Sequence, residues 1–210
     1  MHRRWRRGTA AGRRGGLAIG LVFVISGCGA PPTPLSGLNA SYERALVRTA
    51  PRAVMLDGKA EQRVFDKLQR YFAGMTPASV REQTAMVYAP GSYLNDTLVG
   101  IDGAPGIEGY FGHTVESTDV LTVEFLDRAP VGIDWYVRWR MTVVVKGLNG
   151  GAPVISYGVS QLRFDADGRV LLHKDFWDSG TGLHEQLPVL GTIVGRVRAA
   201  IAPGASEALR

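Results

Sequence analysis

Cysteine is almost absent from this chain: among its 210 residues only Cys28 is a cysteine. The chain can therefore form neither an internal disulfide nor a cysteine-based metal site. Its four histidines show neither HxxxH nor HxH spacing, which argues against a structural zinc site. A glycine-rich phosphate loop is also lacking, because Gly147, Gly150 and Gly151 belong to a predicted hairpin turn. We therefore expect no metal and no cofactor.

The excess of basic charge is confined to the start of the chain. The formal net charge is +5, but six arginines lie within the first 14 residues, where no acidic residue occurs. Without them, 18 basic residues face 19 acidic ones. This near-neutral remainder has no broad basic field of the kind that attracts nucleic acid.

A short apolar run follows the arginines, over residues 17–25, and it falls well below the ~20 residues that a membrane-spanning helix needs. A basic head, a short apolar run and small residues are typical of a secretory signal peptide. The next string, Ile25-Ser26-Gly27-Cys28, resembles the lipobox of bacterial lipoproteins, with Ile in place of the usual Leu. The resemblance implies cleavage after residue 27 and a lipid on Cys28. The alternative is an unprocessed anchor with a buried cysteine.

The lipobox resemblance also implies a location. A lipidated Cys28 would anchor the protein to a membrane of the bacterial cell envelope. The residue after the cysteine is Gly29 and not aspartate. By analogy with enteric bacteria, this favours the outer membrane, facing the periplasm, in a cell that has one.

The rest of the chain divides into three parts. Residues 28–56 begin with a stretch rich in proline, glycine and serine, which predicts a flexible tether with room for a short helix after residue 40. Residues 57–185 have the periodicities of one folded domain. Residues 186–210 predict a C-terminal helix and tail, with Pro188 marking a break or restart.

Within residues 57–185, helical periodicity comes first and strand alternation follows. Helices are expected over residues 58–73, 76–88 and 104–118, and strands over 92–100, 120–126, 133–146, 154–164 and 170–177. Helices segregated from a hairpin-built antiparallel sheet predict an α+β fold. A curved sheet wrapped on helices leaves a cone whose mouth can hold a ligand.

This order of elements resembles the nuclear transport factor 2-like superfamily, which includes SnoaL-like cyclases. The most specific match is the ending, in which the turn at residues 165–168, Asp-Ala-Asp-Gly, leads into His173-Lys174-Asp175-Phe176-Trp177-Asp178. The strings at residues 88–96 and 109–111 also match. The resemblance implies the cone-shaped fold over residues 57–185. It does not fix the function, because this fold hosts many chemistries.

The resemblance points to two acidic residues as candidate catalytic groups. Asp175 matches the final-strand pocket aspartate of limonene epoxide hydrolases, and Asp96 lies near the proton-shuttling aspartate of ketosteroid isomerases. A carboxyl group in an apolar cone has a raised pKa, which suits general acid or base work. Each residue also has a structural alternative: Asp175 can pair with Arg138, Arg140 or His173, and Asp96 can cap a turn.

Further residues are candidates for lining the ligand pocket. Strand alternation places His173 on the same face as Asp175 and Trp177. Tyr93-x-Asn95 resembles the water-orienting pair of the epoxide hydrolases, and Ser160 falls at the oxyanion-hole position of ketosteroid isomerases. The complete set of pocket candidates is Tyr93, Asn95, Tyr110, Trp139, Ser160, His173 and Trp177.

Both catalytic sets are incomplete. Where the epoxide hydrolases have Arg-x-Asp, this chain has Arg138-Trp139-Arg140, and a serine hydroxyl is a weaker donor than a neutral carboxylic acid. The leading hypothesis is therefore an envelope lipoprotein that binds a small, largely apolar ligand in its cone. One alternative is an isomerase, dehydratase or cyclase that uses Asp96 and Asp175. The other is a protein-interaction module that dimerises through its open sheet face.

The last predicted helix leaves two interpretations open. An apolar stripe runs along it, accompanied by Arg196 and Arg198. The stripe either packs on the domain or lies at a membrane surface.

Overall fold

The computed structural model describes residues 35–201, and the predicted signal peptide and Cys28 lie outside them. The chain begins with α1 (Leu35–Thr49) and the short 3-10 helix η1 (Ala50–Arg52). The remaining elements are α2 (Gly58–Ala73), α3 (Pro77–Val87), β1 (Tyr88–Asn95), β2 (Gly100–Asp102), α4 (Ala104–Glu116), β3 (Thr118–Val131), β4 (Asp134–Val145), η2 (Asn149–Gly151), β5 (Val154–Phe164), β6 (Val170–Trp177), α5 (Ser179–Gly182), η3 (His184–Gln186) and α6 (Pro188–Ile201).

Local signals in the sequence set the starts of α2 and α3. The Asp57 side chain accepts a hydrogen bond from the Ala60 amide at 2.8 Å. Thr76 and Ser79 form a reciprocal capping box, and Pro77 occupies the first turn of α3. These caps satisfy amide groups that a helix start leaves free. The predicted apolar stripe of α2 is buried along its length.

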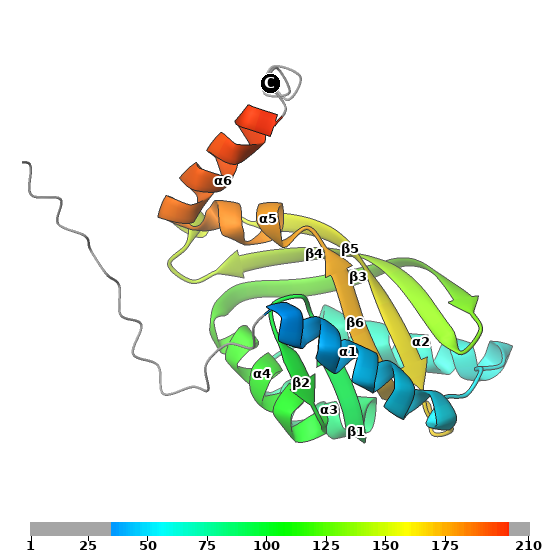
Figure 1. The fold of residues 1–210 in the computed structure, drawn as a ribbon. Coiled ribbons are helices and arrows are strands. Elements are labelled where there is room, and N and C mark those ends of the chain that lie inside the picture. Colours follow the sequence, from blue (N-terminus) through cyan, green and yellow to red (C-terminus); the bar gives the residue numbers. More distant parts are fainter. Residues whose placement is uncertain (1–34, 202–210) are drawn as a thin grey trace, which may run out of the picture. The chain divides into compact units, whose positions relative to one another are not determined.

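The sheet has six strands in the order β2-β1-β6-β5-β4-β3. Only the β1–β6 pair is parallel, and the other neighbours are antiparallel. The predicted strand at residues 92–100 is wrong in its bounds, because β1 begins at Tyr88, directly after α3, and ends at Asn95. The α+β class and the curved sheet are confirmed (Figure 1).

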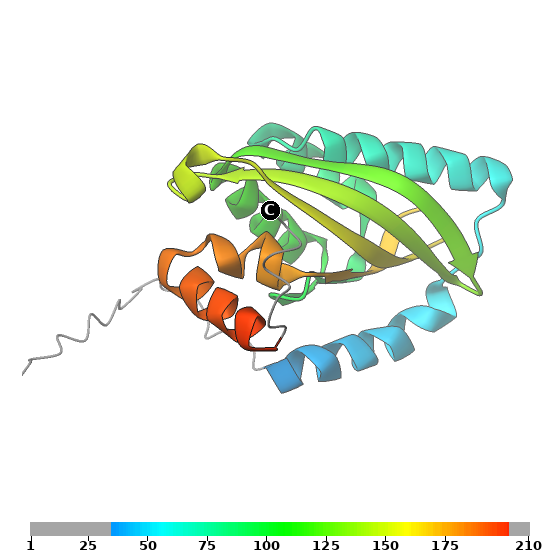
Figure 2. The same ribbon diagram turned by 90° about the horizontal axis from the view of Figure 1, so that it is seen from above.

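Helices α2, α3 and α4 pack on one face of the sheet, which we call the inner face (Figure 2). Aromatic rings fill this layer. The Phe65 ring lies 5.2 Å from that of Trp135 and 5.5 Å from that of Phe164, centroid to centroid. The alternation of β4 places Trp135, Val137 and Trp139 on this side, and all three are buried. This aromatic layer is the main hydrophobic core.

Helix α1 packs on the opposite face, which we call the outer face. The sequence left room for a short helix after residue 40, but the helix begins at Leu35, so the prediction of a tether is wrong from that residue on. Ala45 of α1 is buried against Tyr93 of β1 and Leu172 of β6. Arg163 of β5 donates to the Leu46 carbonyl at 2.6 Å and forms an ion pair with Asp134. The folded domain therefore begins at α1 and not at residue 57.

The prediction for residues 186–210 fits α6, which begins at Pro188. Residues 202–210 lie outside the described part of the chain. Helix α6 follows α5 and η3 and projects away from the sheet (Figure 1).

We predict that Arg163→Met lowers the free energy of unfolding by about 3 kcal/mol, because it leaves the half-buried Asp134 carboxylate and an α1 carbonyl without their donor. Urea unfolding of the whole chain measures this loss. The matched control is Arg140→Met on the same face. The Arg140 side chain is 38% exposed and lies 3.8 Å from that of Glu124, so its loss costs less than about 1 kcal/mol. Equal losses in the two variants would contradict the role given to α1.

Candidate functional site

The pairing of β5 with β6 brings the central candidates together on the inner face. Ser160 lies opposite Asp175, and Leu162 lies opposite His173. Paired residues of an antiparallel ladder project to the same side. On the neighbouring strand β4, Val137 pairs with Ser160 and Trp139 with Gly158, so the Trp139 ring faces this same side. Gly158 is required here, because a Cβ atom would lie 2.3 Å from the Trp139 ring.

A continuous chain of hydrogen bonds joins these side chains. Trp139 Nε1 donates to Ser160 Oγ at 2.8 Å, and Ser160 Oγ donates to Asp175 Oδ1. His173 Nε2 lies 2.9 Å from the same Asp175 oxygen, and its Nδ1 lies 2.7 Å from the Tyr88 hydroxyl. In the tautomer with its proton on Nε2, His173 donates to Asp175, and its Nδ1 accepts from the Tyr88 hydroxyl.

Aromatic rings enclose the inner end of this chain. The His173 ring meets the Phe72 ring edge-on at 5.9 Å and stacks against Tyr88 at 6.1 Å. Burial raises the pKa of the Tyr88 phenol well above its ordinary value, with the charge of Asp175 adding to the effect. Tyr88 therefore remains protonated at physiological pH and holds the imidazole in place.

Asp175 marks the change from this buried cluster to solvent. Its side chain is 16% exposed, whereas that of His173 is 7% exposed. Both hydrogen bonds from Ser160 and His173 reach Oδ1. Among the described residues, no donor reaches Asp175 Oδ2. This oxygen is therefore free to accept a hydrogen bond from a ligand or from water.

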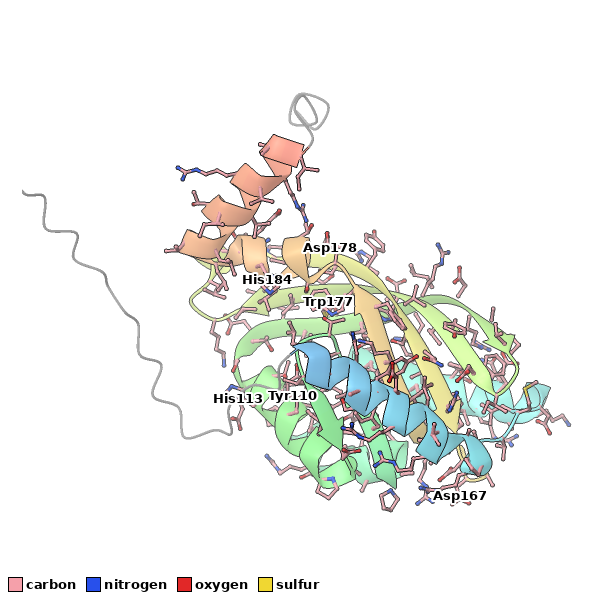
Figure 3. All side chains as sticks on the ribbon, in the orientation of Figure 1. Tyr110, His113, Asp167, Trp177, Asp178 and His184 are labelled. Atoms are coloured by element: carbon pink, nitrogen blue, oxygen red, sulfur yellow. The ribbon has the colours of Figure 1, made fainter. Side chains whose placement is uncertain are left out.

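Asp96 and Tyr110 form a second polar pair near the same end of the sheet. Asp96 Oδ1 accepts from the Leu98 and Val99 amides, each at 3.0 Å, and Oδ2 accepts from the Tyr110 hydroxyl. Trp177 Nε1 donates to the Asp96 carbonyl at 2.8 Å, which ties the end of β6 to this loop. Figure 3 labels Tyr110 on α4 and Trp177 at the end of β6, next to α5.

The environment of this pair favours the neutral carboxyl form. Burial raises the pKa of Asp96, and the three hydrogen bonds that it accepts only partly oppose this shift. The negative charge of Asp175 contributes in the same direction. Burial, together with Asp96 itself, also raises the pKa of Tyr110. Asp96 thus serves as a turn acid, as one alternative held, and burial raises its pKa in the direction that general acid work requires.

The structure places two pocket candidates elsewhere, and for them the prediction is wrong. Tyr93 and Asn95 pair with Leu172 and Lys174, so they project to the outer face beneath α1. The Tyr93 hydroxyl lies 2.7 Å from Ser41 Oγ, and Asn95 accepts from Lys174 Nζ at 2.8 Å. The sequence allows a helix after residue 40, but it does not show that this helix covers the Tyr93 side of the sheet.

The two arginines of β4 also lie on the outer face. Arg138 binds the Asp127 carboxylate, and Arg140 lies near Glu124. No described arginine pairs with Asp175, which is bound by Ser160 and His173 instead. The bridged aspartate pair that the epoxide hydrolase resemblance requires is therefore not formed by the described residues.

Two residues of the site, Tyr88 and Ser156, were not predicted from the sequence. Tyr88 was assigned to the end of a helix, although it begins β1 and holds His173. Ser156 lies on the inner face of β5, four residues before Ser160. Its hydroxyl is buried and lacks a hydrogen-bond partner in the described structure. The alternation of β5 could have identified Ser156, because Ser156 and Ser160 share its parity.

No group of histidine, cysteine, aspartate and glutamate side chains in residues 35–201 could hold a metal ion. A hollow of about 460 Å3 is lined by the outer-face residues Tyr157, Val159 and Phe176, and also by Trp139, Gly158 and Trp177. It therefore reaches the two tryptophan rings from the outer face, but Asp175 is not part of its lining.

Comparisons with known proteins identify the fold. No family model matches this chain, and no curated protein matches it. Solved structures do match. A protein from Catenulispora acidiphila with a ketosteroid isomerase-like fold, crystallised with trimethylamine, has 14% identity and a TM-score of 0.51, with 59% of this chain and 91% of that chain covered.

Two further matches have the same TM-score of 0.51. TsrD from Streptomyces laurentii has 17% identity, with 64% of this chain and 98% of that chain covered. A candidate polyketide cyclase from Acidithiobacillus ferrooxidans has 15% identity, with 63% and 97% covered. Identities this low show the fold and not the activity. The described domain therefore has the nuclear transport factor 2-like fold that the sequence resemblance implied.

Proposed function

We propose that this chain is a lipid-anchored protein of the bacterial envelope whose domain binds a small, largely apolar ligand at the mouth of the cone. The observation that carries the binding function is Asp175, an inward-facing carboxylate with one oxygen held by the protein and one oxygen free. A solved protein with this fold was crystallised with the small molecule trimethylamine, which is consistent with small-ligand binding by this fold.

The surroundings of Asp175 define the chemistry of this ligand. Trp139 and Trp177 lie on the same face as the carboxylate, and they offer apolar and aromatic surface. A ligand with an apolar body and one hydroxyl or amine donor fits this arrangement, because the donor would reach Asp175 Oδ2. A methylated amine would also gain from the aromatic rings.

The expected affinity is modest. Burial of ~200 Å2 of apolar ligand surface contributes about 5 kcal/mol at ~25 cal/mol per Å2, before the cost of association. A hydrogen bond to the charged Asp175 adds about 2 kcal/mol. The polar contact therefore decides whether binding is measurable.

An enzyme of the isomerase, dehydratase or cyclase type is the second candidate. It is favoured by one observation, the raised pKa of Asp96 beside the Tyr110 hydroxyl. Asp96 would then act as the proton-transferring group and Asp175 as its charged partner. Against this, both oxygens of Asp96 are already engaged by the protein.

The outer face supports a further role in association. Tyr157 is 62% exposed there, and Phe176 and Ile155 are also exposed. A homodimer through this open sheet face, on the part that α1 leaves uncovered, would bury these side chains. Such a dimer is compatible with ligand binding on the inner face.

The lipid anchor rests on the sequence. No helix among residues 35–201 is long and apolar enough to cross a membrane. Attachment through Cys28 would place the domain at the membrane that bears the lipid, which we propose is the outer membrane where one exists.

We predict that Asp175→Asn lowers ligand affinity about tenfold, because the amide places a donor where the ligand needs an acceptor. Isothermal titration with trimethylamine measures the loss, and thermal-shift screening with sterols and polyketide-like aromatics extends it to larger ligands. Asp119→Asn is the matched control, because Asp119 is exposed on β3.

Three outcomes contradict this account in different ways. Turnover of a substrate that disappears in Asp96→Asn or Asp175→Asn would make the protein an enzyme. Equal affinity in Asp175→Asn and wild type would place the ligand elsewhere. The absence of any thermal shift, combined with a stable dimer in solution, would favour the protein-interaction module over ligand binding.

A second prediction concerns the pH dependence of stability. A raised pKa means that folded Asp96 binds its proton more tightly than unfolded Asp96, which titrates near pH 3.9. The free energy of unfolding therefore falls as pH rises from about 4 to the folded pKa. We expect Asp96→Asn to gain stability over wild type across this interval, as measured by urea unfolding at a series of pH values. A difference that stays constant with pH would refute the raised pKa.

The third prediction concerns the anchor. Cys28→Ala should release the protein from the membrane fraction or block its processing, because the thiol that would accept the lipid is gone. Cell fractionation and intact-mass analysis of the wild-type protein and of this variant give the readout. A wild-type protein that begins at an unmodified Met1 would rule out the anchor.

A further inference from the structure

Helix α6 presents a continuous apolar face that nothing in the described structure covers. At 100° per residue, seven of its apolar side chains fall within less than half of the helix circumference. They are Val189, Leu190, Ile193, Val194, Val197, Ala200 and Ile201. Val189 is 76% exposed and Ile201 78% exposed, and Ile193 and Val197 are about half exposed. Such a face on a helix at the edge of a domain is a docking surface.

A different face of α6 holds the helix to the domain. Arg198 forms ion pairs with Asp178 at 3.2 Å and with Glu185 at 2.9 Å. Gly191 allows close contact, because a Cβ atom there would lie 2.3 Å from the Glu185 carbonyl oxygen. Gly191 and Arg198 are seven residues apart and so lie on nearly the same side. The apolar face is therefore directed away from this attachment.

The charge of α6 favours one kind of partner. The helix contains two arginines and no acidic residue. Arg198 is neutralised by its ion pairs, whereas Arg196 is exposed at the border of the apolar face. An apolar face bordered by arginine is the pattern of a helix that lies in the interface of an anionic bilayer.

Helix α6 lies on the side of the domain that a lipid on Cys28 would hold near the membrane. This step of the inference rests on the proposed lipid. Six residues lie between Cys28 and Leu35, the start of α1, so seven Cα–Cα steps join the two. Even fully extended, they span no more than about 25 Å. Figures 1 and 2 place α6 on the same side of the domain as the first turn of α1.

We propose that α6 is a second membrane contact, with its apolar face inserted at the surface of an anionic bilayer. Helix α6 follows β6 through α5 and η3, and β6 ends with Asp175 and Trp177. A membrane-bound α6 would hold the mouth of the cone close to the lipid interface. The ligand of the cone is then a molecule that partitions into the bilayer.

The test uses single cysteines in the lipidated chain, since acylation would leave no other free thiol. Ile193→Cys places a fluorescent probe on the apolar face, and Ala199→Cys places it on the far side of the same helix. Each labelled protein is reconstituted into vesicles of phosphatidylglycerol and phosphatidylcholine that contain nitroxide-labelled lipid. We expect a blue-shifted emission and nitroxide quenching at residue 193 and neither effect at residue 199.

The failures of the two proposals are distinguishable. A probe on Cys28, detected by mass analysis, would show that the cysteine is not acylated. The comparison of residues 193 and 199, repeated in a Cys28→Ser background, would still decide the role of α6. Equal quenching at both positions would overturn the proposal. A blue shift at residue 193 without vesicles would also overturn it, because the face would then be covered by a second copy of the chain.

Discussion

The register between β5 and β6 is the constraint on which the site depends. It sets Ser160 opposite Asp175 and Leu162 opposite His173, so that a carboxylate, an imidazole and a hydroxyl face the aromatic layer together. A shift by one residue would turn all of them to the outer face. Their hydrogen bonds in turn stabilise the register, because Trp139 of β4 binds Ser160 and Tyr88 of β1 binds His173. Fold and site are therefore held by the same contacts.

This arrangement explains why one carboxylate is available and the other is not. Asp175 is bound on one oxygen by two protein donors, which orient it while the second oxygen stays free. Asp96 is bound on both oxygens and sits in an environment that favours its neutral form. A fixed acceptor among tryptophan rings is better suited to hold a ligand than to transfer a proton, which is why binding is the function proposed first.

Much of this could be predicted from the sequence, because the signals were local. The alternation of residues 154–164 and 170–177 gives β5 and β6 with their observed bounds, and Thr76-Pro77 marks the start of α3. The predictions that were wrong concerned residues whose positions depend on contacts distant in sequence. Tyr93 and Asn95 were placed in the pocket because nothing in their own strand shows that α1 covers the opposite face. The role of Tyr88 depends on His173, 85 residues later.

The central claim is that Asp175 holds a ligand at the mouth of the cone. The most direct measurement is a crystal structure of the protein purified from its own membrane with whatever molecule remains bound. The account predicts density for an apolar molecule on the inner face, with a donor atom within hydrogen-bond distance of Asp175 Oδ2 and its body against Trp139 or Trp177. Density confined to the outer-face hollow beside Tyr157 and Phe176, with only water at Asp175, would contradict it.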